Sequence, residues 1–109
     1  MQIRKTYKNI NPTILYDEIK GFVQKQGIKL DENRLETYSM PSDSSNFVYR
    51  GTLTFKVQDK EGLRAHIIGT DKGETKLMLD SVDELFPKEK IAALEDDLNF
   101  MLGSYEPLQ

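Results

Sequence analysis

Eight polar or aromatic side chains in the sequence could together recognise an anion. They are Arg4, Arg34, Tyr38, Arg50, Lys56, Arg64, His66 and Lys76, and they include all four arginines of the protein. Guanidinium and ammonium groups neutralise phosphates and carboxylates, and an aromatic ring can stack on a nucleic-acid base. If these side chains share one face of a sheet, they predict a binding surface for an anionic partner, either a nucleic acid or an acidic protein surface.

The same residues also have an ordinary structural explanation. Long basic side chains are common on the solvent-exposed face of an antiparallel sheet, where Arg34 or Arg50 could pair with Glu36 across strands. The chain carries a net charge of −3, which opposes tight non-specific binding to nucleic acid. The sequence leaves the binding surface and the solvated surface open as alternatives.

The chain contains few of the groups that catalysis requires. It has no cysteine and one histidine, which excludes thiolate nucleophiles, cysteine-bound zinc and multi-histidine metal sites. His66 has no evident serine partner, and Gly69 and Gly73 do not form a dinucleotide-binding or phosphate-binding loop. The acidic residues between positions 80 and 97 do not have the spacing of a calcium-binding EF-hand loop. We therefore predict a protein that is not an enzyme and that uses no metal and no cofactor.

The composition predicts one globular domain. Of the 109 residues, 38% are hydrophobic and 30% are charged, which is typical of a chain with a single packed core. We expect one domain over residues 1–109, with a loose tail after Tyr105. No apolar run approaches the ~18 residues of a membrane span, and no secretory pattern is evident, so we expect a cytoplasmic protein without membrane attachment.

Alternation of apolar and polar residues predicts five strands. The strongest pattern covers residues 47–57, where the side chains alternate without interruption. The other predicted strands are residues 2–7, 34–40, 63–69 and 75–82. Turn-forming residues at 41–46, 59–62 and 71–73 indicate that the last four strands follow one another as antiparallel hairpins.

Apolar residues at helical spacing predict two helices. In the first, Asn11 is the expected N-cap, Pro12 the first helical residue and Gly27 the left-handed residue beyond its end. Its apolar stripe consists of Leu15, Ile19, Phe22 and Val23, and Gly21 within it predicts a close approach to the sheet. The second helix follows Pro87, and its stripe consists of Ile91, Leu94, Leu98, Met101 and Leu102.

The order strand, helix, four strands, helix predicts an α+β fold. Two one-sided helices are best accommodated on one face of a twisted antiparallel sheet, in the order β-α-β-β-β-β-α. The parity of each strand then directs a set of apolar residues toward the helices: Ile3, Leu35, Phe55, Leu63 and Leu77. The eight candidate binding residues fall on the opposite, open face.

This element order resembles that of one repeat of the TATA-binding protein. It is also similar to the helix-grip fold of plant pathogenesis-related and START-type lipid carriers, without their extra helix and strands. The resemblance covers nearly the whole chain but concerns topology, and no family motif accompanies it. It implies either an open sheet face that grips DNA or a cavity for an apolar ligand between the sheet and the C-terminal helix. A shared fold does not transfer function.

Two further functions remain open. A carrier of a small apolar ligand requires a cavity, lined by residues such as Leu53, Phe55, Leu98 and Met101. A structural protein could instead form a homodimer through its exposed sheet or an edge strand. Phe100 lies off the apolar stripe of its helix, which leaves two alternatives: an exposed aromatic side chain that marks a protein contact, or packing against the N-terminal strand or the tail.

Overall fold

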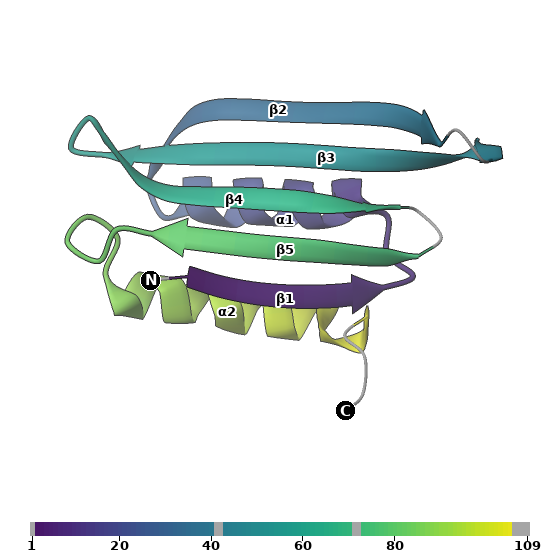
Figure 1. Cartoon of the computed structure of the whole chain (residues 1–109). Helices are drawn as coiled ribbons and strands as arrows, with labels where there is room; N and C mark the ends of the chain where they lie inside the picture. The colour runs from purple at the N-terminus through teal and green to yellow at the C-terminus, as the bar shows by residue number, and fades with distance from the viewer. Residues whose placement is uncertain (1, 41–42, 71–72, 106–109) are drawn as a thin grey trace.

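Five strands and two helices make up the described part of the chain. The computed structural model describes residues 2–40, 43–70 and 73–105 (Figure 1). The strands are β1 (Gln2–Lys8), β2 (Lys29–Met40), β3 (Asp43–Val57), β4 (Lys60–Thr70) and β5 (Glu74–Ser81). The helices are α1 (Pro12–Lys25) and α2 (Lys88–Leu102), and a short 3₁₀ turn, Gly103–Tyr105, follows α2. The tail predicted after Tyr105 lies outside the described residues.

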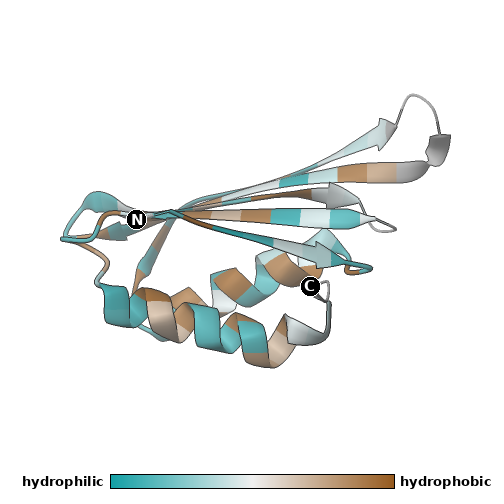
Figure 2. Ribbon diagram, turned by 60° about the horizontal axis from the view of Figure 1, so that its bottom comes forward, coloured by the Kyte–Doolittle hydropathy of each residue, from teal (hydrophilic) through white to brown (hydrophobic). Residues whose placement is uncertain are grey.

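The strands form one antiparallel sheet in the order β1-β5-β4-β3-β2. Both helices lie on the same side of this sheet, so that the molecule has a sheet layer and a helix layer (Figures 1 and 2). The predicted α+β class, the element order and the placement of the helices are therefore confirmed. One face of the sheet remains uncovered by helices.

The core lies between the two layers. Phe55, Leu63 and Leu77, predicted to face the helices, are fully buried there, and Ile3 packs against the same cluster. Burial of one such aliphatic or aromatic side chain stabilises a fold by about 1.5–3 kcal/mol. The helices contribute buried side chains at helical spacing: Leu15, Ile19 and Val23 from α1, and Ile91, Leu94, Leu98 and Leu102 from α2.

The prediction that Leu35 belongs to the core is wrong. Leu35 pairs with the buried Gly51 and therefore lies on the helix side of the sheet, but 41% of its surface is exposed. Tyr49, which lies on the same side of β3 as Phe55, is only half-buried. A 14-residue helix is roughly 21 Å long, whereas a 15-residue strand extends roughly 50 Å. The far end of the β2–β3 hairpin therefore projects beyond the helices (Figures 1 and 2). Leu35 itself is exposed because β2 is the edge strand of the sheet, since Gly51 opposite it still lies under Tyr16 of α1.

Two predicted turns differ from the structure. The sequence places a turn at residues 59–62, but Val57 pairs with Lys60, so the turn consists of Gln58 and Asp59. Both have positive φ angles, 54° and 62°, as a tight two-residue hairpin requires. The turn expected at residues 41–46 overlaps β3, which already begins at Asp43, and the predicted turn residues 71 and 72 lie outside the described part. Long-range strand pairing has extended the hairpins beyond what local composition indicates.

The ends of α1 are as the sequence predicts. The Oδ1 atom of Asn11 accepts a hydrogen bond from the backbone N–H of Thr13 at 2.9 Å, and Gly27 has a φ of 81°. In α2, however, Met101 is 51% exposed, because the buried stripe continues from Leu98 to Leu102 instead. Phe100 is 87% exposed, so of its two alternatives the structure shows the exposed one and not packing against another element. Neither helix is both long and apolar enough to cross a lipid bilayer.

Helix α1 approaches the sheet closely at Gly51, not at Gly21. A Cβ atom added at Gly21 would meet no atom within 4 Å, so the predicted close approach there is wrong. A Cβ atom at Gly51 would lie 2.8 Å from Cδ2 of the buried Tyr16 ring. Glycine in β3 thus makes room for an aromatic side chain of α1.

Two carboxyl groups meet where α1 and α2 contact each other. A side-chain hydrogen bond with Asp97, followed by burial and the charge of Asp97, raises the pKa of Glu18, and Lys25 partly opposes this rise. A hydrogen bond between two carboxyl groups needs a proton on one of them. The folded protein therefore retains a proton on Glu18 in a pH range where the unfolded chain has lost it.

We expect the stability of the protein to decrease as the pH rises through the raised pKa of Glu18. In that range the folded state binds more protons than the unfolded state, so a rising pH favours unfolding. Glu18→Gln should remove this dependence and increase the free energy of unfolding at neutral pH by up to about 1 kcal/mol. Urea unfolding between about pH 5 and pH 8 measures the effect. Asp17→Asn, on the exposed neighbour, is the control, and an equal effect of both substitutions would contradict this role of the pair.

Candidate functional site on the open sheet face

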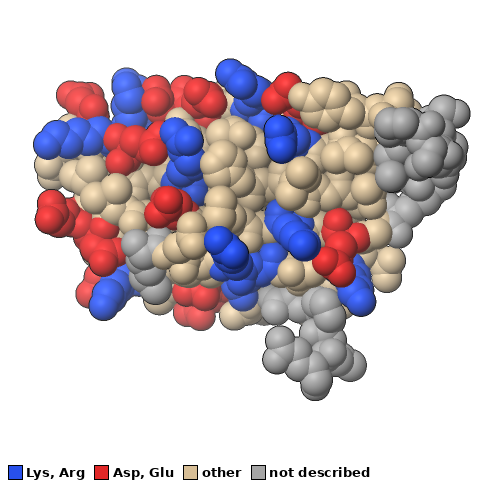
Figure 3. Space-filling view, viewed as in Figure 1, with Lys and Arg blue, Asp and Glu red and all other residues tan. Residues whose placement is uncertain are grey.

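The strand register arranges side chains of the open face, the sheet surface opposite the helices, in rows that cross the strands. One central row runs from β1 to β2 and consists of Arg4, Met78, His66, Thr52 and Arg34. The next row consists of Thr6, Lys76, Ile68, Arg50 and Glu36. Figure 3 views this face and shows blue basic side chains around an uncharged central area. The first row thus has an arginine at each end, whereas in the second row Lys76 and Arg50 flank Ile68 and the acidic Glu36 ends the row.

Two adjoining hollows lie along these rows. The first, of about 380 Å³, is lined on the open face by Arg4, Thr6, Lys76, Met78, His66 and Ile68. The second, of about 410 Å³, is lined by Arg34, Glu36, Arg50 and Thr52 together with the same His66, Ile68 and Met78. The three shared residues form a common floor, in which Ile68 is 42% exposed. The hollows therefore make one shallow surface and not two separate sites.

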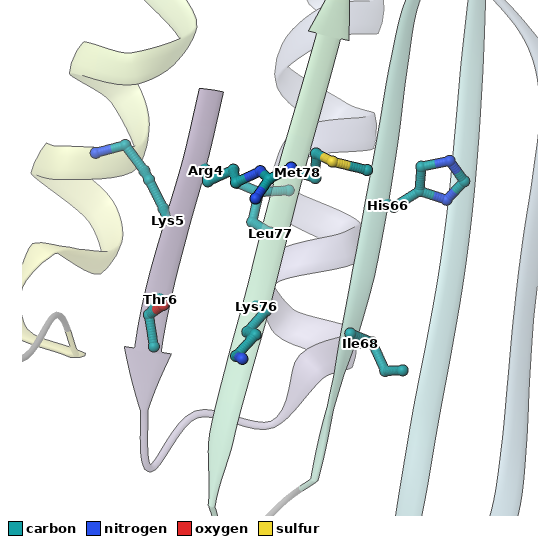
Figure 4. A pocket seen from close by; sticks show the side chains of 8 residues that line it. All are labelled: Arg4, Lys5, Thr6, His66, Ile68, Lys76, Leu77 and Met78. Atoms are coloured by element: carbon teal, nitrogen blue, oxygen red, sulfur yellow. The ribbon is translucent and has the colours of Figure 1, made fainter. Parts of the chain in front are cut away.

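Figure 4 shows the first hollow from close by. Arg4 and Lys76 come from adjacent strands, and His66 and Ile68 come from β4 beyond β5. Lys5, the neighbour of Arg4, points instead toward α2, where its Nζ atom donates a hydrogen bond to Oδ1 of Asn99 at 3.0 Å. Alternation along β1 thus assigns Arg4 to the open face and Lys5 to the helix layer.

Four of the predicted cations form two pairs on this surface. Arg4 and Lys76 are diagonal neighbours on β1 and β5, and Arg34 and Arg50 are diagonal neighbours on β2 and β3. Diagonal neighbours are about 7–8 Å apart, whereas four strand spacings, roughly 19 Å, separate Arg4 from Arg34. The four cations therefore do not surround one small anion. They match an extended partner with negative charges at intervals.

Arg64 and Lys56 lie apart from these pairs and have acidic neighbours of their own. Arg64 forms an ion pair with Glu61 at 2.8 Å and lies opposite Asp80 in the sheet. Lys56 forms an ion pair with Asp31 at 3.4 Å. Exposed pairs of this kind are weak, but they lower the positive potential that an approaching anion would meet. The structure therefore places both predicted residues on the open face and outside the central basic pairs.

Tyr38 and Glu36 lie next to the basic pair Arg34 and Arg50 and interact with each other. The Tyr38 hydroxyl donates a hydrogen bond to Oε2 of Glu36, and Glu36 lies directly opposite Arg50. The hydrogen bond to Glu36 is the main cause that raises the pKa of Tyr38, while the charges of Arg50 and Arg34 lower it. The phenol therefore stays neutral at physiological pH. Its exposed ring lies beyond the basic pair, toward the projecting end of the hairpin.

His66 lies at the centre of the face, opposite Thr52 on the adjacent strand. Its Nδ1 atom is 3.5 Å from Oγ1 of Thr52, an unactivated hydroxyl. In the described ranges, no three His, Asp or Glu side chains are close enough together to hold a metal ion. Thr52 is a neighbour that the sequence did not reveal, because the register that places it opposite His66 depends on the two-residue turn at Gln58 and Asp59 and on the register shift between Phe55 and Lys56. The alternation of side chains along β4 and β5 is by itself enough to place the hydrophobic residues Ile68 and Met78 on the open face.

The chain has no recognised relatives: no known protein family, curated protein or solved structure matches it. The likeness to the TATA-binding protein and to helix-grip proteins is therefore one of element order. No matching protein therefore indicates what the open face binds.

Proposed function

We propose that this protein is a non-catalytic binding module whose open sheet face binds an extended anionic partner. The observation that carries the proposal is the position of Arg4 and Lys76 at one side of a shared apolar floor and of Arg34 and Arg50 at the other. All four basic side chains are exposed. A partner that crosses the strands could make charge-assisted hydrogen bonds at both ends and hydrophobic contact between them.

An acidic segment of another protein fits this surface best. The floor between the basic pairs is formed by Ile68, Met78 and His66, which suits aliphatic side chains better than a row of bases. The aromatic ring of Tyr38 lies outside the hollows. Single-stranded nucleic acid is the second candidate, because the two cationic pairs could contact phosphates at intervals along one strand.

Arg50→Ala should weaken binding of an anionic partner by up to about tenfold, since one charge-assisted contact is lost. Fluorescence anisotropy with a labelled glutamate-rich peptide and a labelled single-stranded oligonucleotide measures this at low and moderate salt. Arg64→Ala is the matched control, because Arg64 is exposed on the same face but already paired with Glu61. It should change the affinity much less.

The two probes separate the candidate partners. For the oligonucleotide, the logarithm of the affinity should fall linearly with that of the salt concentration, and Arg50→Ala should reduce the slope by about one contact. For the peptide, the substitution should chiefly slow association. Absence of oligonucleotide binding at ~50 mM salt would exclude nucleic acid, and absence of binding to both probes would overturn the proposal.

A carrier of apolar ligands has less support. Of the four residues expected to line its cavity, Leu53, Phe55 and Leu98 are fully buried in the packed core, whereas Met101 is exposed. A ligand between sheet and helix would therefore have to displace core side chains.

A further inference from the structure

β2 is an edge strand with an unusual length of free edge. It pairs with β3 on one side, and no described element lies beyond it on the other (Figure 1). It has 12 residues, compared with seven in β1 at the opposite edge, and it contains no proline. An edge strand exposes backbone N–H and C=O groups that can pair with another strand. Where its side chains are described, they are exposed or half-exposed.

The side chains of β2 are complementary to those of a second, antiparallel copy. We propose that two copies of this chain form a dimer by pairing β2 with β2, with Leu35 opposite Leu35 of the second copy. In this register, Arg34 of each copy lies opposite Glu36 of the other, which gives two ion pairs on the open face. Glu32 of each copy lies opposite Tyr38 of the other. On the helix side, the two Leu35 side chains, each 41% exposed in the single chain, cover one another.

Neighbouring registers are less favourable. In the proposed pair, both copies keep their open faces on the same side. The register can therefore change only so that side chains of the same face remain opposite each other. A centre at Arg34 places two arginines opposite each other, and a centre at Glu36 places two glutamates opposite each other. A centre at Asn33 would bring the irregularity between Leu30 and Glu32 into the pairing. The register centred on Leu35 keeps the regular part of β2 and opposes unlike charges.

The local structure prepares Glu36 for this contact. The Tyr38 hydroxyl donates to Oε2 of Glu36, so the other oxygen, Oε1, can accept from Arg34 of the second copy. Pairing would join the two sheets into one with all helices on the same side. It would also bring the Arg34–Arg50 pairs of both copies to the dimer axis. The inference depends on the free edge of β2 and not on anion binding.

Sedimentation of the full chain from low micromolar to millimolar concentration tests the dimer. We expect a monomer–dimer equilibrium, with Arg34→Glu and Glu36→Arg each raising the dissociation constant by at least roughly tenfold, because each opposes like charges twice. The double variant R34E/E36R restores unlike charges in both pairs and should recover most of the affinity. Circular dichroism of each variant tests whether it is folded. A wild-type chain that stays monomeric, or a double variant as weak as the singles, would overturn the inference.

A cross-link identifies the register. The chain has no cysteine, and residues directly opposite in an antiparallel pair have Cα atoms about 4.5–5.5 Å apart, within the range of a disulfide. Leu35→Cys should therefore form an intermolecular disulfide on mild oxidation. Thr37→Cys is the matched control, since two such cysteines would be roughly 13 Å apart along the strands. Equal cross-linking of both variants would show that the dimer, if present, uses another surface. Anion binding by a wild-type chain that stays monomeric would leave the proposed function intact.

Discussion

Leu53→Ala is expected to reduce the free energy of unfolding by about 2–5 kcal/mol. Leu53 is fully buried in the cluster between β3 and the helices, so the substitution removes apolar contacts and leaves a cavity that neighbours fill only in part. Urea unfolding followed by circular dichroism measures the change. A loss below about 1 kcal/mol would mean that this side of β3 does not face the core.

Leu35→Ala is the matched control for this experiment. Simple alternation assigns Leu35 to the same core, but its 41% exposure predicts a loss below about 1 kcal/mol. The comparison should be made at a protein concentration where the chain is monomeric, because Leu35 lies at the proposed dimer axis. Equal losses in both variants would indicate that the helix layer covers more of the β2–β3 hairpin than Figure 2 shows.

Gly51→Ala should destabilise the protein by about 1–3 kcal/mol, the range for overpacking of a core. The added methyl group would lie 2.8 Å from Cδ2 of Tyr16, and the buried ring can move away only by displacing α1 or its neighbours. Thermal or urea unfolding measures the loss. A simultaneous Tyr16→Leu substitution should reduce the loss of stability caused by the new methyl group, because leucine lacks the ring atoms that this methyl group would meet.

Gly21→Ala should have the opposite effect on stability. The position is inside α1 and has open space around a new Cβ atom, so alanine should stabilise the helix by about 0.5–1 kcal/mol. If Gly21→Ala were destabilising instead, α1 would approach a neighbour more closely than the structure indicates. The pair of substitutions thus locates the contact between α1 and the sheet.

The proposed binding surface also explains why the charges of the chain are unevenly distributed. Residues 1–70 contain 11 basic and 8 acidic side chains, whereas residues 71–109 contain 4 basic and 10 acidic ones. Three of the four central cations, Arg4, Arg34 and Arg50, come from the first part. The second part includes α2, with Glu95, Asp96 and Asp97 in the helix layer. Folding therefore separates a basic sheet surface from an acidic helix.

The sequence alone determined the class of the fold, the position of most elements and the parity of the strands. These features depend on local patterns: alternation every second residue, apolar stripes at helical spacing, and cap residues such as Asn11 and Gly27. They placed Phe55, Leu63 and Leu77 in the core and assigned all eight candidate residues to one set of strand positions.

Only the tertiary structure decided which of those positions lie close together. Strand order and register arise from contacts between residues far apart in the chain, so local patterns could not show that Arg4 lies beside Lys76, or that Arg34 lies beside Arg50 and far from Arg4. Leu35 is exposed because the strand order leaves β2 at the edge of the sheet, beside the part of β3 that Tyr16 of α1 covers at Gly51. The close approach occurred at Gly51 because the space that a side chain needs depends on its partner across the layers, here the ring of Tyr16, and not on its own sequence neighbours.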